Sequence, residues 1–268
     1  MTLAHIVLTR FNVASAGREA AVRMASGWLD RRFDLFERYC LPSVADQSVS
    51  NFQWLVYFDA ATPTEFRDRI DRARRVFPFR PIFVGGMDKT RVAADVRASV
   101  PQEALRVLTT RLDNDDAIAR FYFASIAQAA TGSDDGTVLN FPSGLALRDG
   151  RVHAARDESN PFASLVEDAA QPETIWAVAH RALASRYRVR QIEAEAMWLQ
   201  VVHGDNVTNR IKGRRLDGRE ALRHFPALQA EPLEESGPFD LALDRGLFQP
   251  ARQLRESAID VAKILLRR

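Results

Sequence analysis

The chain has 268 residues, of which 46% are hydrophobic, so it is long enough to bury a sizeable core. Its 37 basic and 35 acidic residues leave a formal net charge of +2, and this near-balance argues against a dedicated nucleic-acid binder. The single cysteine, Cys40, excludes an intramolecular disulfide and fits a reducing compartment. Because no apolar run approaches the ~18 residues that cross a bilayer, we expect a cytoplasmic protein.

The first half alternates short apolar runs with helical patterns. Buried strands are expected at residues 5–9, 52–58, 81–84 and 105–112. Helices are expected at 28–44, from 62 to about 76, and at 117–130, and the first of them should bury Cys40. Thr62 is the expected N-cap of the second helix, and Glu65 should complete a capping box. This alternation predicts an α/β fold with a central, mostly parallel sheet flanked by helices.

The second half has a mixed pattern that begins near residue 135. A hairpin is expected over 137–148 and 151–155, with Asp149-Gly150 as its turn. Residues 174–180 read as a further strand, and 187–199 and 217–224 as helices. Residues 229–238 are acidic and contain prolines, which is typical of a surface loop. We expect the two halves to form a single domain.

Three carboxylates follow the fourth expected strand within four residues. The stretch reads Arg111-Leu112-Asp113-Asn114-Asp115-Asp116. Alternate residues at a strand end can converge, and divalent cations such as Mg²⁺ prefer carboxylate oxygens together with substrate phosphates. The alternative interpretation is that Asp115 or Asp116 caps the following helix while the others are solvated.

Other polar residues follow the first two expected strands. Asp59 ends the second strand, so it should share a sheet edge with Asp113, where ligands bind in parallel sheets. Asp59 could contact a base or ribose, or it could be a turn residue. Arg10 and Asn12 end the first strand and either face the same cleft or are ordinary loop residues.

Histidines offer a further ligand type. His203 lies in an apolar run that ends in Gly204-Asp205-Asn206, and a neutral imidazole could complete a metal site begun by carboxylates. A structural role is the alternative for His203, and His180 is ambiguous in the same way. The other three histidines, His5, His153 and His224, are expected to be structural.

The C-terminal segment, residues 251–268, has the pattern of a basic amphipathic helix. It could lie on an anionic membrane surface. The alternative is that its apolar stripe docks on the rest of the domain.

Together these residues resemble the bacterial putative rhamnosyltransferase family, which consists of GT-A-type glycosyltransferases. The stretches that carry the resemblance are 7–13 (VLTRFNV), 35–44 (LFERYCLPSV), 52–59 (FQWLVYFD), 110–118 (TRLDNDDAI), 160–167 (NPFASLVE) and 198–206 (WLQVVHGDN). Their order and spacing agree over roughly residues 5–213. The resemblance implies a GT-A-like fold, with a nucleotide-binding half over 1–135 and an acceptor-side half over 136–250.

The resemblance also implies an activity and a set of site residues. It implies a nucleotide-sugar donor, a carbohydrate or glycolipid acceptor, and Mg²⁺ or Mn²⁺ on the donor diphosphate. The implied metal ligands are Asp113, Asp115 and His203, and the implied donor-binding residues are Arg10, Asn12, Asp59, Arg111 and Asp113. A catalytic base is expected downstream: Glu167 is the candidate that we choose, and Asp168, Glu193 and Glu195 are alternatives.

Two other functions use the same residues. A metal-dependent nucleotidyltransferase or phosphohydrolase would need the same carboxylates. A glycosyltransferase-like scaffold that only binds a partner or a glycan would not turn over a donor. The three carboxylates within residues 113–116 favour an enzyme over a non-catalytic scaffold.

Overall fold

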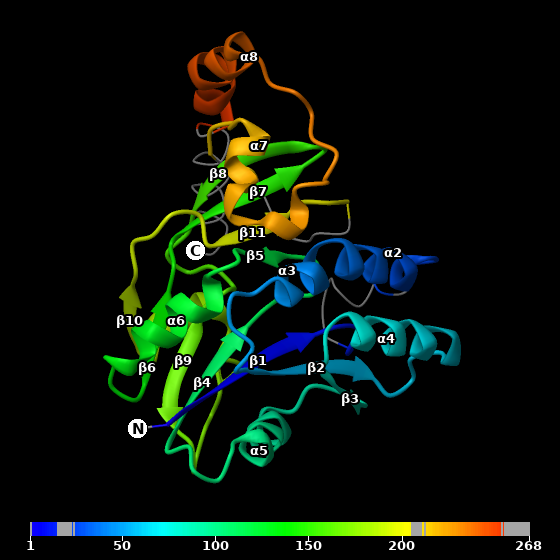
Figure 1. Cartoon of the computed structure of the whole chain (residues 1–268), viewed down its shortest axis with the longest axis vertical. Helices are drawn as coiled ribbons and strands as arrows, with labels where there is room; N and C mark the ends of the chain where they lie inside the picture. Colours follow the sequence, from blue (N-terminus) through cyan, green and yellow to red (C-terminus); the bar gives the residue numbers. More distant parts are fainter. Residues whose placement is uncertain are drawn as a thin grey trace, which may run out of the picture.

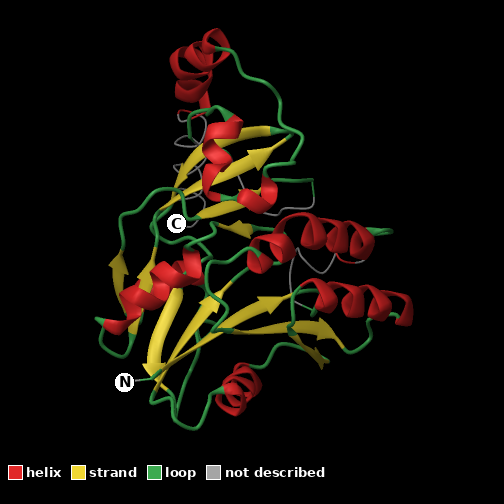
Figure 2. Ribbon diagram, in the orientation of Figure 1, coloured by secondary structure: helices red, strands yellow, loops and turns green. Residues whose placement is uncertain are grey.

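Two β-sheets organise the chain (Figures 1 and 2). The structure is a computed structural model, and it describes residues 2–14, 23, 25–204, 211, 213–252 and 254. A seven-stranded sheet has the order β10-β6-β9-β4-β1-β2-β3, and a four-stranded sheet has the order β5-β11-β7-β8. In Figure 1 the smaller sheet lies above the larger one.

The larger sheet is mostly parallel. Its strands are β1 (Leu3–Arg10), β2 (Gln53–Asp59), β3 (Arg80–Val84), β4 (Arg106–Arg111), β6 (Thr137–Asn140), β9 (Ser164–Asp168) and β10 (Arg188–Gln191). Strand β9 alone runs antiparallel to its two neighbours, β4 and β6. The six other strands therefore end at one edge of the sheet, and β9 begins there.

The smaller sheet begins with β5, directly after the acidic stretch of residues 113–116. Its strands are β5 (Ala117–Ile118), β7 (Ser143–Arg148), β8 (Arg151–Arg156) and β11 (Trp198–Val201). The predicted Asp149-Gly150 turn joins β7 to β8, and both turn residues have positive φ, 50° and 71°. That geometry is the one that Asp-Gly turns favour in two-residue hairpins.

Helices cover both faces of the larger sheet. Helix α2 (Trp28–Leu35), the π-helical turn η1 (Phe36–Cys40), α3 (Leu41–Ala45), α4 (Thr64–Val76) and α6 (Tyr122–Thr131) pack on one face. Helix α5 (Lys89–Ser99) and the 3₁₀ helix η2 (His180–Ser185) pack on the other. The remaining helical segments are α7 (Gly218–Ala221), η3 (Leu222–His224), η4 (Pro226–Leu228), α8 (Pro238–Leu243) and η5 (Asp244–Phe248).

Alternate residues of the central strands supply two separate cores. Val7, Val56 and Phe58 belong to the core under α2, α3, α4 and α6, whereas Ile6 and Leu55 belong to the core under α5. This alternation follows from the two-residue period of a strand. Cys40 is fully buried, as predicted. The cores hold the ends of the parallel strands in register, which positions the residues that follow them.

Most predictions for the first half are confirmed, and two local predictions are wrong. The predicted helix at 117–130 begins only at Tyr122, because Ala117–Ile118 form strand β5 of the smaller sheet. The four predicted strands, the helices that follow them and the mostly parallel sheet are all present. Thr62, however, does not cap α4, whose N-cap is Pro63 and lacks a side-chain hydrogen bond. The Thr62 hydroxyl instead donates to the carbonyl oxygen of Asp59, 2.6 Å away, and accepts from the Asn12 side chain.

Several predictions for the second half are wrong. The predicted strand 137–148 is two strands in different sheets, β6 and β7. Residues 174–179 form turns and bends that lead into η2, and 187–199 holds β10 and the start of β11 instead of a helix. Since β6, β9 and β10 lie in the larger sheet, the boundary near residue 135 does not separate two folding units.

The predicted helix at 217–224 is confirmed as α7 and η3, with Asp217 accepting from the backbone N–H of Glu220. The predicted C-terminal amphipathic helix lies almost wholly outside the described residues, because 253 and 255–268 are not among them. Among the described residues, no helix is both long enough and apolar enough to cross a membrane.

The buried imidazole of His5 predicts a pH-dependent stability. His5 lies under the Phe123 ring and its Nε2 is 2.8 Å from the Thr110 hydroxyl. Burial lowers the pKa of His5 from 6.5 to about 3. The unfolded chain therefore takes up a proton below about pH 6.5 that the folded chain does not, so stability falls as the pH falls through that value.

Between about pH 7 and about pH 5, this one group should cost about 2 kcal/mol of unfolding free energy. The variant His5→Gln keeps a polar atom near Thr110 and cannot titrate, so it should lose that much less stability over the same interval. Urea denaturation of both proteins at the two pH values measures the difference. Equal losses in the two proteins would contradict the assignment.

Candidate donor site at the carboxyl edge of the sheet

The acidic stretch and Asp59 lie at the same edge of the larger sheet. Strand β1 pairs in parallel with both β2 and β4, with Arg10 opposite Tyr57 and Leu8 opposite Arg111. Asp59 ends β2 and Asp113 follows β4 by two residues, so both lie where the parallel strands end. The predicted shared edge is therefore confirmed.

Two members of the acidic stretch hold the loop in place. The Asn114 side chain donates to the carbonyl oxygen of Phe11, 2.9 Å away, which links the loop after β4 to the loop after β1. Asp116 accepts from the backbone N–H of Val201 at 2.9 Å, which links it to β11 of the smaller sheet. Burial, together with the charges of Asp115 and Asp113, raises the pKa of Asp116. Both side chains are buried, and their hydrogen bonds fix the conformation of the loop that follows β4.

Asp115 lies between two partners from distant parts of the chain. Its Oδ2 is 2.6 Å from Nη1 of Arg32 on α2 and 2.9 Å from Nε2 of His203, which follows β11. Burial by itself would raise the pKa of Asp115, but Arg32 and His203 outweigh it and lower the pKa to about 2. Asp115 is therefore ionised at neutral pH although it is almost fully buried.

Asp113 is the most exposed carboxylate of the stretch. Its side chain is 33% exposed, compared with 11% for Asp115, and it accepts two hydrogen bonds from the guanidinium of Arg111, at 3.2 and 3.1 Å. Nη1 of Arg111 also lies 3.4 Å from Nδ1 of His180. Burial and the charge of Arg111 lower the pKa of His180 to about 4, so the imidazole is neutral at neutral pH.

A second group of hydrogen bonds joins the ends of β1 and β2. The Asn12 side chain accepts from the backbone N–H of Asp59 and donates to the Thr62 hydroxyl, each at 3.0 Å. The Asp59 carboxylate accepts from the backbone N–H of Ala61 and pairs with Arg23 at 3.1 Å. The buried Asn12 side chain therefore links the ends of the two strands, whereas the Asp59 carboxylate is partly exposed. Arg10 ends β1 at this edge and is also partly exposed.

The side chains at this edge could supply some, but not all, of the ligands that a divalent ion needs. Two ligands at right angles around an ion, each ~2.1 Å from it, lie ~3 Å apart. Asp115 Oδ2 is an oxygen ligand of the kind that Mg²⁺ and Mn²⁺ prefer, and it lies 2.9 Å from Nε2 of His203, whose imidazole is a ligand more typical of zinc, copper or iron. Asp113 does not join them, and no three His, Cys, Asp or Glu side chains among the described residues form a ready site. Substrate phosphates would have to supply the remaining oxygens.

The structure does not bring Glu167 to this edge. Strand β9 runs antiparallel to β4, and Glu167 pairs with Val107 near the start of β4, at the opposite end of the sheet. Its two carboxylate oxygens accept the backbone N–H groups of Glu173 and Thr174, at 2.8 and 3.0 Å. Glu167 therefore lies at the opposite end of the sheet from Asp59 and Asp113, because β9 runs in the reverse direction.

The alternative bases are also paired elsewhere. Glu193 and Glu195 are exposed side chains that form ion pairs with Arg156 and Arg223. Asp168 follows Glu167 at the far end of β9, where it accepts from the backbone N–H of Ala170. Asp168 is therefore at the opposite end of the sheet, whereas Glu193 and Glu195 follow β10, which ends at the same edge as β4, but both are occupied by ion pairs with arginines.

Two arginines at the site were missed in the sequence. Arg32 contacts both Asp115 and Asn114 and lies over the Trp28 ring, 5.2 Å from its centroid. Arg23 pairs with Asp59 and also donates to the carbonyl oxygen of Asn12. Arg32 carries one sequence signal: it follows Trp28 by four residues on a predicted helix, the spacing at which side chains meet. Arg23 carries none that we recognise.

Comparison with known proteins assigns the family. The sequence profile of a family described as "Putative rhamnosyl transferase" matches residues 4–215. The chain belongs to this family. The predicted resemblance is thus confirmed, and with the observed sheet it establishes the α/β, GT-A-like fold class. No curated protein matches the sequence.

Several solved structures are similar to part of this chain, at low sequence identity. S. aureus TarS 1–349 in complex with UDP has a TM-score of 0.45 and 12% identity, over 75% of this chain and 61% of that one. A Pyrobaculum calidifontis mannosyltransferase in complex with GDP-Man and Mn²⁺ has a TM-score of 0.43 and 11% identity, over 73% of this chain and 56% of that one. The chain thus spans less than two thirds of the length of either neighbour.

The neighbouring carboxylates Asp115 and Asp116 should differ in their importance for stability. Asp115→Asn leaves Arg32 without its buried counter-ion and should cost about 3 kcal/mol. Asp116→Asn keeps an acceptor for the Val201 N–H and resembles the neutral acid that the raised pKa favours, so it should cost less than about 1 kcal/mol. Urea denaturation in the presence of a chelator separates these effects from metal binding. Equal costs would contradict the proposed roles.

Proposed function

We propose that this chain is a metal-assisted glycosyltransferase. It would move a sugar, rhamnose if the family description holds, from a nucleotide-sugar donor to a carbohydrate or glycolipid acceptor. The observation that carries the proposal is the pairing of Asp115 with His203, 2.9 Å apart, at the sheet edge that also presents Asp113 and Asp59. Family membership supports the same reaction class.

In this proposal, different side chains contact the nucleoside and the diphosphate of the donor. Asp59 and Arg10, at the ends of β2 and β1, would contact the nucleoside. Asp113 and Arg111 present one negative and one positive group beside the diphosphate, and Arg32 adds a cation next to Asp115. The fixed cations Arg111 and Arg32 would stabilise the negative charge that develops as the nucleoside diphosphate departs, because they need no reorganisation during the reaction.

Asp115 and His203 would hold a divalent ion, Mn²⁺ or Mg²⁺. When bound, such an ion neutralises negative charge on a leaving diphosphate. Asn114 and Asp116 act indirectly, since their hydrogen bonds to Phe11 and Val201 keep the stretch between the two sheets. Arg32 holds the Asp115 carboxylate ionised and oriented, which a metal ligand requires.

Removal of the Asp113 carboxylate tests the donor site. Asp113→Asn should lower kcat/KM for donor turnover by about 100-fold, because the Asp113 carboxylate accepts two hydrogen bonds from Arg111 and would hold that cation toward the diphosphate. Its side chain is one-third exposed, so the melting temperature should change little. The reaction should release a free nucleoside diphosphate, whereas pyrophosphate or a monophosphate would instead indicate a nucleotidyltransferase or a phosphohydrolase.

The matched control is Asp134→Asn. Asp134 is 91% exposed and precedes β6, at the opposite end of the sheet from Asp113. This variant should keep full activity. Unchanged activity in Asp113→Asn, or equal losses in both variants, would refute the site.

The position of Glu167 gives a second kinetic prediction. Glu167→Gln keeps an acceptor for one of the two backbone N–H groups and lies away from the donor edge. Its kcat should stay within about threefold of the unmodified enzyme, well short of the 10²–10⁴-fold that a general base contributes. Steady-state rates across a range of pH values provide the measurement. A loss of about 1,000-fold would restore Glu167 as the base.

A further inference from the structure

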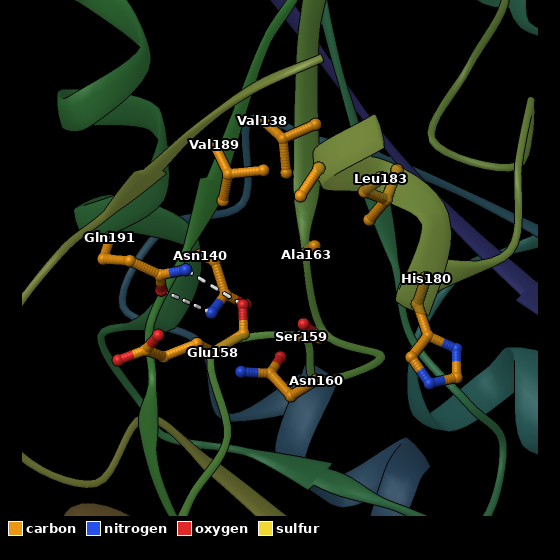
Figure 3. A pocket seen from close by; sticks show the side chains of 11 residues that line it. Val138, Asn140, Glu158, Ser159, Asn160, Ala163, His180, Leu183, Val189 and Gln191 are labelled. Carbon is orange, nitrogen blue, oxygen red and sulfur yellow. Dashed lines mark hydrogen bonds between the residues drawn. The ribbon is translucent and has the colours of Figure 1, made fainter. Parts of the chain in front are cut away.

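A small pocket of about 140 Å³ lies beside the edge at which the parallel strands end (Figure 3). Its lining comes from the carboxyl end of β6, the residues just before β9, the 3₁₀ helix η2 and strand β10. Strand β9 is antiparallel to β6, so its first residues reach the edge at which β6 ends.

The lining has an aliphatic part and a polar part. The aliphatic side chains are Val138, Ala163, Leu183 and Val189, and the polar ones include Asn140, Glu158, Asn160 and Gln191. In Figure 3 the labelled valines and Leu183 lie on one side of the pocket, and the amides and Glu158 lie on the other. Such a two-sided lining suits a ligand with one polar and one apolar face.

Asn140 offers the pocket an unused acceptor. It is only 1% exposed, and its Oδ1 is buried without a hydrogen-bond partner. Gln191 fixes the orientation of the Asn140 amide: its Nε2 donates to the carbonyl oxygen of Glu158 at 2.9 Å, so its Oε1 accepts the Asn140 Nδ2–H at 2.8 Å. A buried acceptor without a partner costs about 1–3 kcal/mol, so a ligand hydroxyl that donates to Oδ1 would be favoured.

The charge of the lining argues for a neutral ligand. Its lining residues include one carboxylate, Glu158, and neither lysine nor arginine. A phosphate or carboxylate ligand would need a cation, but Arg111 and Arg156, which contact the lining residues His180 and Glu158, already pair with carboxylates. The pocket is therefore chemically distinct from the donor edge, where anionic phosphates are expected.

His180 connects the two sites. It lines the pocket, and its Nδ1 lies 3.4 Å from Nη1 of Arg111, which pairs with Asp113. A ligand in the pocket would therefore lie across His180 and Arg111 from the donor phosphates. That is the side of the site opposite to Asp59 and the expected nucleoside.

We propose that this pocket binds a neutral sugar ring. A hydroxyl of the sugar donates to Oδ1 of Asn140, and the C–H face of the ring packs on Val138, Leu183 and Val189. The assignment to a sugar rests on the proposed transferase function. The ring belongs either to the acceptor glycan or to the donor's own glycosyl group, and these two sources share the chemistry described here.

Saturation-transfer NMR with methyl glycosides of neutral hexoses tests the proposal. Ala184 is an exposed residue of η2 that lines the pocket, so Ala184→Trp should block it without disturbing the fold. The matched control is Ser185→Trp, one residue further along η2 and outside the lining. Saturation of the sugar protons should be lost in the first variant and kept in the second. Asn140→Ala should weaken binding by about tenfold, the effect of about 1.4 kcal/mol.

Two NMR measurements, one with free glycosides and one with a nucleotide sugar, identify the source of the sugar. Binding of free glycosides without nucleotide indicates the acceptor. Pocket-dependent saturation of only the glycosyl protons of a nucleotide sugar indicates the donor. Both results support the pocket. No pocket-dependent saturation of any neutral sugar, or stronger binding of a methyl glucuronide, would overturn it.

A parallel measurement separates this proposal from the transferase function. A thermal-shift titration with nucleoside diphosphates and Mn²⁺ reports on the donor edge alone. Sugar binding that Ala184→Trp abolishes, in a protein that shows no such thermal shift, would refute the donor site and still support the pocket.

Discussion

The buried carboxylate of Asp115 joins three segments that are far apart in the chain. It follows β4 of the larger sheet, its first partner Arg32 comes from α2, and its second partner His203 follows β11 of the smaller sheet. An ionised carboxylate in a buried position is tolerated only with partners that outweigh its desolvation. The same requirement that stabilises Asp115 therefore brings an imidazole and a guanidinium to the carboxyl edge of the sheet.

The four residues of the acidic stretch consequently have separate tasks. Asn114 and Asp116 form hydrogen bonds with the backbone of Phe11 and Val201, and Asp115 pairs with Arg32 and with His203, the residue with which it would hold an ion. Asp113 retains substantial exposure and turns toward Arg111. A pattern of closely spaced aspartates thus does not by itself say which carboxylate faces a ligand. Here the burial of three members leaves Asp113 as the one directed outward.

The sequence predicted this arrangement as far as local patterns determine it. The parallel strands follow from apolar runs, and the shared edge of Asp59 and Asp113 follows from the strand ends. The helix at 187–199 was wrong because the apolar residues of β10 and β11 satisfy a helical period in isolation, and tertiary pairing with β6 and β7 decides between the two. Arg32 was missed because its partner Asp115 is 83 positions away, a distance that no local pattern spans.

The reversed direction of β9 accounts both for the misplacement of Glu167 and for the neighbouring pocket. A parallel strand would present its last residues at the donor edge, and Glu167 would then have been close to Asp113. Because β9 is antiparallel, it presents its first residues there, and the preceding Asn160 and Ala163 line the pocket beside Asn140. One change of strand direction therefore replaces a carboxylate at this edge with amides and small apolar groups. That replacement favours the hydroxyls and C–H groups of a neutral ligand next to the edge where we propose that donor phosphates bind.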